Sequence, residues 1–521
     1  MRKPSIWGVL MYYVEDKDQL MIEDFSMPFE GKLDPNNRWV RLAGIMPWDH
    51  IEEIYLQTMS VETGRRAFPS RIAFGAIFIK ESENYTDEGC VTAIQENPYM
   101  QYFLGLHVFE QEPLFDPSMM VHFRKRFPVQ EVVRINEYVC TGKWPEDGRN
   151  VDRNEVTEKD DTNDGDDDDH DPPADESVGS SGRKPIKGRK NPNKSKKKRK
   201  KKNRGKLIVD ATVAPSDIKY PTDIGLLNQC REHYETAINM LWAEIPHTGH
   251  KLPYSAKKAR QSYLNIAKSK RWTAKKLRKA IGEQLDYIEK AEKQLLKFLL
   301  LAPDVKLPNW LLDRLQVIPL VYAQQKEMYD NNTRTCKDRI VSLAQPFVRP
   351  IQRGKRPNPT EFGQKLHLSV IDGYTFLEQT SWSNFNESTD LKAVVKDYRR
   401  KFGVYPEAIL ADKIYQTIAN RKYCKKHGIR LSGPPLGRPK GGEAGAKESR
   451  QMYKDACERN AIEGRNGNLK RRYGLDQIMS KLDDTAKTEA ALNILAMNAA
   501  HRLRRWLLLI FKILGLEIVF Q

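Results

Sequence analysis

The segment KLIVDATVAP (Lys206–Pro215) decides the fold, because a short apolar run rich in β-branched residues leads directly into an aspartate, Asp210. A second segment, AILADKIY (Ala408–Tyr415), leads in the same way into Asp412. Apolar runs of this length and composition predict buried β-strands. Because α/β sheets usually place their functional groups at the carboxyl ends of strands, we predict that each strand ends at its aspartate and delivers a carboxylate to one site.

A third acidic residue lies in a segment of helical composition, CERNAIEGRNGNLKRRYGL (Cys457–Leu475). On a helix, Glu463 shares a face with Arg459, and Lys470 lies two turns beyond on nearly the same side. A carboxylate among basic side chains suits phosphoryl transfer, since the acid can bind a divalent metal while the bases hold phosphates. A solvated, salt-bridged helix is the alternative that this segment alone leaves open.

Asp210, Asp412 and Glu463 together supply three hard oxygen ligands, the donor type that Mg²⁺ and Mn²⁺ prefer. Two such ions can activate an attacking oxygen and stabilise a leaving one. We therefore predict a site for two Mg²⁺ ions, with Mn²⁺ as a substitute, held by these three carboxylates.

The elements between the acids predict an α/β domain with a mixed sheet. From Ile208 the patterns indicate a strand, a large α-helical insertion over about 224–344, a hairpin that turns at Asp372-Gly373, a helix, the strand with Asp412, a helix with a short strand, and the helix with Glu463. Glu361 and Asp372 are rival acids for the site. However, Asp372 fits the turn and Glu361 precedes the strand.

Two further regions contain candidate DNA-binding residues. Residues 339–358 form a proline-broken basic segment suited to strand contact, and residues 1–145 predict helices with a basic turn, which suggests recognition of DNA ends, for example by a helix-turn-helix. Core packing is the alternative for the aromatic residues of these N-terminal helices. The candidate DNA-binding residues are Arg124, Lys125, Arg353, Lys355, Arg459, Arg465, Lys470 and Arg471.

Length and charge divide the chain and indicate its partner. The 521 residues allow two to four domains, and 87 Lys+Arg against 69 Asp+Glu give a net charge of +18, which favours a polyanionic partner, nucleic acid above all. Residues 146–206 are acidic and then intensely basic, so they predict a disordered linker. The predicted division is a helical N-terminal domain for DNA ends and dimerisation (1–145), this linker, a catalytic domain (207–508) and an apolar tail (509–521).

The cysteine pattern and the apolar segments bear on the compartment. The six cysteines include no CxxC pair, which favours reduced thiols in a cytoplasm. The N-terminal apolar run is too brief for a signal peptide. The C-terminal apolar segment is interrupted by Lys512 and Glu517 and falls short of the roughly 20 apolar residues of a membrane span. We therefore expect no membrane association and a core or docking helix at this end.

The sequence resembles the bacterial insertion-sequence transposases of the InsH-type group, which have an RNase H-like DDE catalytic domain. The resemblance covers most of the chain. The segments that carry it are PYMQYFLGL (98–106), LFDPSMMVHFRKRF (114–127), IVDATVAPSDIKYPTD (208–223), RPIQRGKRPNPTEFGQKLHLSVIDGY (349–374), ILADKIY (409–415) and SGPPLGRPKG (432–441).

The glutamate signature of that family is Tyr, two residues, Arg, three residues, Glu, six residues, Lys. Arg459, Glu463 and Lys470 match its last three positions, but Ala456 stands at the tyrosine position. The contribution of that tyrosine is therefore absent or supplied by another residue such as Tyr453. By resemblance, the fold is an RNase H-like catalytic domain preceded by a mostly helical domain, and Asp210, Asp412 and Glu463 form the catalytic triad.

The resemblance implies a Mg²⁺-dependent DNA transposase of the bacterial cytoplasm, associated with the nucleoid. Such an enzyme binds the terminal inverted repeats of an insertion sequence, cleaves the ends and joins the 3′-OH ends to target DNA. A synaptic homodimer is expected, because two ends must be cut and joined together. Two alternatives remain open: a metal-dependent nuclease of the same fold without strand transfer, and a domesticated DNA-binding protein without catalysis.

Overall fold

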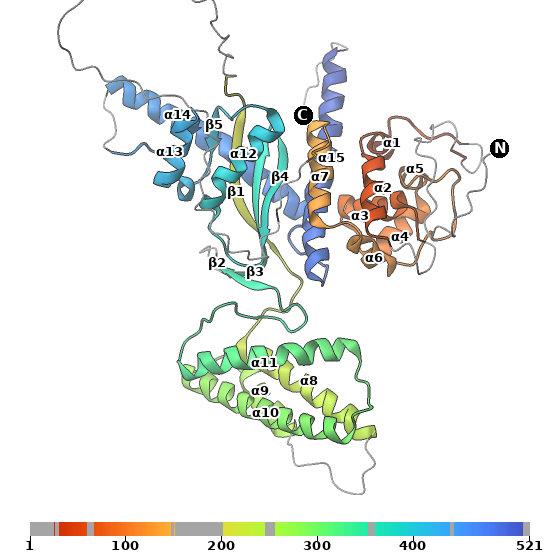
Figure 1. The fold of residues 1–521 in the computed structure, drawn as a ribbon, viewed down its shortest axis with the longest axis vertical. Helices are drawn as coiled ribbons and strands as arrows, with labels where there is room; N and C mark the ends of the chain where they lie inside the picture. Colours follow the sequence, from red (N-terminus) through yellow and green to blue (C-terminus); the bar gives the residue numbers. More distant parts are fainter. Residues whose placement is uncertain are drawn as a thin grey trace, which may run out of the picture.

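The computed structural model describes residues 25–26, 31–59, 67–146, 151, 202–244, 256–352, 360–437 and 442–513, with the side chains of 507–513 excepted (Figure 1). Most of the predicted linker 146–206, including 152–201, lies outside the described residues, as do Arg353 and Lys355. Among the described helices, none combines the length and the apolar run that a membrane crossing requires.

A mixed sheet carries the two predicted aspartates. Its strand order is β2-β3-β1-β5-β6, and β4 also pairs with β3. β1 is antiparallel to β3 and parallel to β5, and β5 is parallel to β6, which confirms the predicted mixed sheet. The strands are β1 (Lys206–Pro215), β2 (Arg349–Gln352), β3 (Thr360–Ile371), β4 (Tyr374–Ser381), β5 (Ala408–Leu410) and β6 (Arg430–Leu431).

Three details of the strands differ from the sequence-based expectation. β1 continues for five residues beyond Asp210, so this aspartate lies within the strand and not at its end. β5 ends at Leu410, two residues before Asp412. The segment Arg349–Gln352, expected to be a basic loop, forms β2 because it pairs with the first residues of β3.

The hairpin of β3 and β4 turns where the sequence predicts. Asp372 and Gly373 have φ angles of 50° and 82°. Two consecutive residues with positive φ define the tight turn whose twist matches antiparallel strands, and the Asp-Gly pair accepts this conformation readily.

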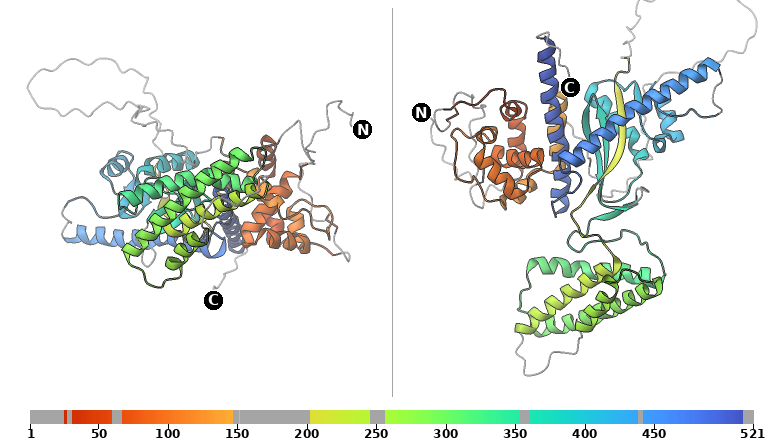
Figure 2. Two further views of the ribbon diagram at one scale, coloured as in Figure 1. Left: turned by 90° about the horizontal axis from the view of Figure 1, so that it is seen from below. Right: turned by 180° about the vertical axis from the view of Figure 1, so that it is seen from behind.

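Helices cover both faces of the sheet. On one face, α12 (Leu391–Phe402) and α13 (Ile418–Lys426) enclose a core that includes Leu207, Val209 and Ile409. On the other face lie α7 (Val129–Thr141), α14 (Gly442–Arg472) and α15 (Asp483–Ile513), and the right-hand view of Figure 2 shows α14 running diagonally across the strands. Since strand side chains alternate between faces, Ile208 and Asp210 lie on the α14 face.

The region between β1 and β2 forms a helical bundle with its own apolar core, which Figure 1 shows beyond one end of the sheet. The bundle begins and ends at one neck, because the side chain of Gln345 donates to the backbone oxygen of Asp217 over 3.2 Å. Its helices are α8 (Asp223–Glu244), α9 (Ala256–Ala267), α10 (Ala274–Leu301) and α11 (Asn309–Asp330).

The N-terminal helices share one core with the sheet. A single cluster of buried apolar side chains contains residues of α3, α6, α7, β3, α14 and α15. The short helices that complete this region are α1 (Arg38–Ala43), α2 (Trp48–Gln57), α3 (Ser70–Glu83), α4 (Asp87–Glu96), α5 (Pro98–Phe103) and α6 (Met119–Lys125). The hydrophobic core is therefore continuous across the predicted domain limit at residue 145.

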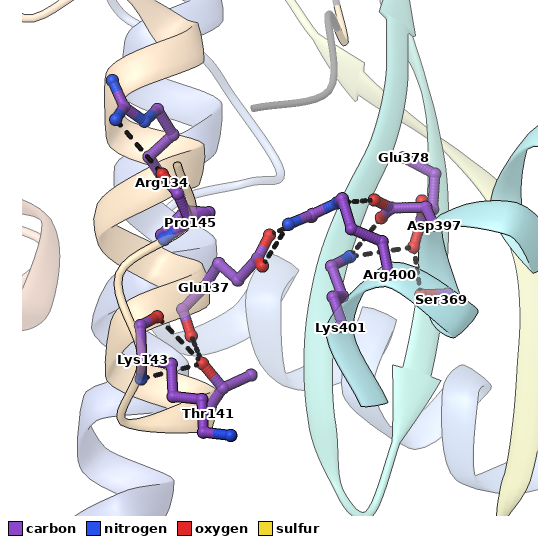
Figure 3. A network of polar contacts seen from close by, with 10 residues as sticks. All are labelled: Arg134, Glu137, Thr141, Lys143, Pro145, Ser369, Glu378, Asp397, Arg400 and Lys401. Atoms are coloured by element: carbon purple, nitrogen blue, oxygen red, sulfur yellow. Dashed lines mark hydrogen bonds and ion pairs between the residues drawn. The ribbon is translucent and has the colours of Figure 1, made fainter. Parts of the chain in front are cut away.

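Polar contacts fix α7 to the sheet and to α12 and α15. The amide of Asn498 on α15 is fully buried and donates to Asn136 Oδ1 (2.8 Å) and to the Thr375 backbone oxygen (2.6 Å), while it accepts from the Thr375 N–H (2.9 Å). Glu137 binds the guanidinium of Arg400 through both carboxylate oxygens, at 2.8 and 2.5 Å (Figure 3). These contacts hold the helical region in one orientation to the sheet.

We predict that Asn498→Ala lowers the free energy of unfolding by about 1–3 kcal/mol, because it removes the acceptor of the buried Thr375 N–H and one donor each to Asn136 Oδ1 and the Thr375 backbone oxygen. Urea denaturation followed by tryptophan fluorescence measures this loss. Asn460→Ala, at an exposed position of α14, is the matched control and should change stability little. Equal midpoints for the two variants would contradict the role assigned to Asn498.

Candidate active site

Asp210 lies within β1, and Asp412 follows the adjacent parallel strand β5 by two residues. The pairing of β1 with β5 sets Lys206 beside Ala408, Leu207 beside Ile409 and Ile208 beside Leu410. The same register, continued by two residues, sets Asp210 beside Asp412. Val209 and Ala411 both belong to the core on the α12 side, so alternation directs both aspartates to the α14 face. The register of one strand pair thus brings the two predicted acids together.

Local backbone contacts orient the two carboxylates differently. Asp412 is extended (φ −71°, ψ 167°) and caps the short 3₁₀ helix η4 (Lys413–Tyr415), because its Oδ1 accepts from the Lys413 N–H over 2.7 Å. Asp412 is exposed, whereas Asp210 is half-buried and its Oδ1 accepts from the Ala211 N–H over 2.9 Å. The site is therefore open to a ligand from the side of Asp412.

Helix α14 crosses the sheet face that carries the aspartates. Lys206 at the start of β1 pairs with Glu458 at 2.5 Å, and Arg430 at the start of β6 pairs with Asp455. Ile462 and Leu469 are fully buried and form the ridge of the helix that packs on the sheet. Glu458, Ile462 and the residues between them therefore lie above β1, β5 and β6.

Glu463 lies on the flank of α14 that faces away from the start of β1. Successive helical residues rotate by about 100°, so Glu463, Arg459 and Lys470 lie to one side of the buried ridge and Glu458 and Arg465 to the other. Glu458 and Arg465 contact Lys206 and His501, next to the hairpin turn. The Glu463 flank is consequently turned toward the part of the sheet that carries Asp210 and Asp412.

The described residues do not hold a compact three-ligand site in this conformation. Within them, no three His, Cys, Asp or Glu side chains gather closely enough to hold a metal ion. The carboxylate of Glu463 is 59% exposed and contacts Arg459 at 3.5 Å, while the Arg459 side chain is 25% exposed. Glu463 is thus paired with its basic neighbour on the same helix and not with the two aspartates.

The candidate DNA-binding residues fall into different environments. Lys470 is half-buried, while Arg471 and Lys125 are exposed. Arg124 is buried and its guanidinium binds the Asp87 carboxylate through two contacts of 2.9 and 2.6 Å. In this arrangement Arg124 stabilises the helical region and is not available to a DNA phosphate.

Tyr453, which could stand in for the signature tyrosine that Ala456 replaces, lies far from Glu463. Tyr453 is 75% exposed and, ten residues earlier on α14, lies about 15 Å along the helix axis from Glu463. Ala456 lies only seven residues earlier, on the Glu463 flank. Tyr453 therefore does not occupy the place of the residue that Ala456 replaces.

Arg465 belongs to a second basic group, where α14 meets α15. Its guanidinium donates to His501 Nδ1 over 3.1 Å, and the His501 ring packs edge-on against Tyr374 with ring centroids 4.9 Å apart. Burial, together with Arg465, Arg505 and Arg504, lowers the pKa of His501 to about 4. The imidazole is therefore neutral at physiological pH, with Nδ1 as acceptor.

The sequence did not reveal a group of buried polar residues on the sheet face opposite to the aspartates. His367, Asp390 and Tyr415 contact one another on the other face of the sheet, although they are 23 and 48 residues apart along the chain. Tyr415 follows Asp412 closely, but nothing in its spacing indicates a partner on β3. Burial raises the pKa of Tyr415, and the carboxylates of Glu387 and Asp210 raise it further, so its hydroxyl stays protonated.

Comparison with known proteins gives two matches to protein-family models. Residues 409–499, which include Asp412 and Glu463, match the family model described as a transposase DDE domain. Residues 27–126, which include α1 to α6, match the model described as a transposase domain (DUF772).

One curated relative is the "Uncharacterized protein ORF8 in nfe locus" of Rhizobium meliloti, 35% identical over 98 residues. The match covers 19% of this chain and 47% of that protein, so the chain spans about half the length of this relative. No solved structure matches the chain.

The environment of His501 yields a pH prediction. Since the pKa is about 4 in the folded state and about 6.5 in the unfolded chain, the unfolded state binds more protons between these values. The stability that neutral His501 contributes is complete above pH 6.5 and is lost as the pH falls toward 4. We expect Arg465→Ala to raise the folded pKa, because one cation next to the ring is removed.

NMR titration of the His501 ring signal measures this pKa directly. Lys447→Ala, on the exposed first half of α14, is the control and should leave the titration unchanged. An identical titration in Arg465→Ala and Lys447→Ala would show that Arg465 has no influence on His501.

Proposed function

We propose that this chain, which its two family-model matches support as an insertion-sequence DDE transposase, binds the terminal inverted repeats of its element, cleaves the ends and joins the 3′-OH ends to target DNA. The observation that carries this proposal is the register of β1 with β5, which makes Asp210 and Asp412 neighbours on the face that α14 crosses. Structural scaffolding alone gives no reason for two neighbouring carboxylates in the middle of the sheet.

An RNase H-like fold is the interpretation that we give to the catalytic part of the chain. The mixed sheet, with its central strand β1 between antiparallel β3 and parallel β5, and the helices on both faces support it. In this interpretation residues 207–508 form the catalytic domain, and the bundle α8–α11 is an insertion after the first catalytic strand.

The donor set fits divalent metal ions. Asp210, Asp412 and Glu463 offer carboxylate oxygens only, which suits Mg²⁺ and Mn²⁺. When bound, two such ions would stabilise both the attacking and the leaving oxygen of a phosphoryl transfer. Because Glu463 contacts Arg459 on the same helix, we propose that DNA phosphates draw Arg459 away and allow Glu463 to turn toward the aspartates.

The basic residues of α14 then divide into two groups. Arg459 and Lys470 lie on the Glu463 flank, so they hold phosphates next to the scissile bond. Arg465 lies on the opposite flank, beside neutral His501, where it contacts the backbone farther along the duplex. Arg471, Lys125 and the basic segment with Arg353 and Lys355 add phosphate contacts that are independent of sequence.

The N-terminal helices and the basic linker complete the DNA-binding surface in this proposal. We assign the terminal repeats to the α1–α6 region and expect a synaptic homodimer, since two ends must be joined. A nuclease of the same fold would have the same acids without the joining step, so the products of the reaction distinguish these functions.

We predict that the protein, with Mg²⁺, terminal-repeat DNA and a target plasmid, produces cleaved ends and joined products, and that Asp412→Asn reduces both by at least about 10³-fold. Loss of one metal-binding carboxylate removes stabilisation of the transition state worth several kcal/mol. Glu361→Gln, which neutralises the rival acid on β3, is the matched control and should leave both products.

Gel analysis of labelled ends separates the alternatives. Cleavage without joining in the wild-type protein would favour the nuclease, and specific binding without either product would favour a non-catalytic DNA-binding protein. Full activity in Asp412→Asn would exclude the proposed site.

A second prediction concerns the phosphate contacts. Arg459→Ala should weaken binding of terminal-repeat DNA at every sequence tested and reduce the slope of log K against log salt concentration by about 1, because one phosphate contact is lost. Lys447→Ala, a cation at the exposed start of the same helix, is the control. Fluorescence anisotropy over a range of salt concentrations measures both, and an unchanged slope for Arg459→Ala would remove Arg459 from the phosphate contacts.

A further inference from the structure

Three buried polar side chains form a continuous chain on the sheet face opposite to the aspartates. Asp390 Oδ2 lies 3.0 Å from His367 Nδ1, and the Tyr415 hydroxyl lies 3.0 Å from His367 Nε2. The side chains of His367 and Asp390 have no solvent exposure, and Tyr415 is fully buried as well. Water therefore does not compete with any of these contacts.

The donor and acceptor of each contact follow from the chemistry of the groups. An ionised carboxylate only accepts, so His367 Nδ1 donates to Asp390. In a neutral imidazole Nε2 then accepts, and the Tyr415 hydroxyl must donate to it. Breaking one contact would leave a buried polar atom unpaired, which is costly, so the three groups hold one another in a single arrangement.

This chain joins the two backbone segments that carry the aspartates. At one end, the N–H of Tyr415 donates to the Asp412 backbone oxygen (3.1 Å), and Asp412 caps the same turn. At the other end, His367 pairs across β3 and β1 with Ala211, the residue after Asp210. The turn with Asp412 is therefore fastened to the strand that neighbours Asp210.

Two further contacts restrict the same turn. The side-chain amide of Asn420 donates to the backbone oxygens of Tyr415 and Ser388, both at 2.9 Å, and so links the turn to the segment just before Asp390.

The pairing of β3 with β4 also shifts its register between His367 and Leu368. Such bulges direct side chains at functional sites, and this one lies beside the residue that pairs with Asp210.

We infer that the buried chain Asp390–His367–Tyr415 is a positioning device that fixes the spacing between the Asp210 and Asp412 carboxylates and thereby sets the affinity of the site for divalent cations. This inference rests on the proposed function, because it requires that the two aspartates bind metal. Tyr415, His367 and Asp390 lie on the sheet face opposite to the two aspartates. They act through the position of Asp412.

The decisive variant is Tyr415→Phe in the full chain, because it removes one hydroxyl and keeps the buried ring. Titration with Mn²⁺ alone, followed by electron paramagnetic resonance of the unbound ion, measures the affinity of the site. We expect binding about 10-fold weaker than in the wild type, the usual effect of losing a group that orients a metal ligand. In Mg²⁺-dependent cleavage, the half-saturating Mg²⁺ concentration should rise by a similar factor, with the maximal rate recovered at high Mg²⁺.

Tyr398→Phe is the matched control. Tyr398 belongs to the same core cluster, and its hydroxyl donates to the Arg204 backbone oxygen over 2.6 Å. The chemical change and the burial are alike, but this hydroxyl does not contact the turn with Asp412. We expect a loss of thermal stability in both phenylalanine variants and weaker Mn²⁺ binding in Tyr415→Phe alone. Asp390→Asn, which keeps the size of the side chain, should weaken Mn²⁺ binding to a smaller extent.

The outcomes separate this inference from the proposed function. Wild-type Mn²⁺ binding that Asp412→Asn abolishes and Tyr415→Phe leaves unchanged would overturn the inference and keep the metal site. Equal loss of Mn²⁺ affinity in Tyr415→Phe and Tyr398→Phe would show that the Asp390–His367–Tyr415 chain only stabilises the fold. That result would overturn the inference as well. Mn²⁺ binding that does not depend on Asp412 would overturn both.

Discussion

The parallel pairing of β1 with β5 is the constraint on which the rest of the site depends. Only this register sets Asp210 beside Asp412, since a shift of one residue would direct one of the carboxylates to the opposite face. The two strands are 200 residues apart in the chain, from Ile208 to Ala408, and the helical bundle fills much of that interval. Any segment inserted between β1 and β5 must therefore begin and end at the sheet without changing the pairing of these two strands.

The sequence predicts the parts of the fold that depend on local patterns. The Asp372-Gly373 turn, the strand with Asp412 and the helix with Glu463 are recognisable because turn chemistry, β-branched apolar runs and helical spacing act over a few residues. The sequence also identifies Asp210, but it sets the end of the strand at this residue. Asp210 and Thr212 interrupt the apolar run and so conceal that the strand continues to Pro215.

The contacts that sequence patterns could not reveal are those between distant segments. β2 forms because β3 offers it a partner, although Arg349–Gln352 contains a proline and two polar residues. Arg124 looks like a DNA contact in a basic turn, yet Asp87 neutralises it inside the helical region. The chain Asp390–His367–Tyr415 likewise exists only because three elements meet beneath the aspartates. Hydrophobic periodicity carries no information about such long-range contacts, since each contact depends on the packing of the whole sheet.

The helical bundle α8–α11 has an independent interior and a single neck at Asp217 and Gln345. A segment with these two properties behaves as one large closed loop on the sheet, and the entropy cost of such a loop grows only slowly with its length. Substitutions in the bundle interior change its own packing and leave the register of β1 and β5 intact. The bundle can therefore change in length, packing or sequence during evolution without altering the positions of Asp210 and Asp412.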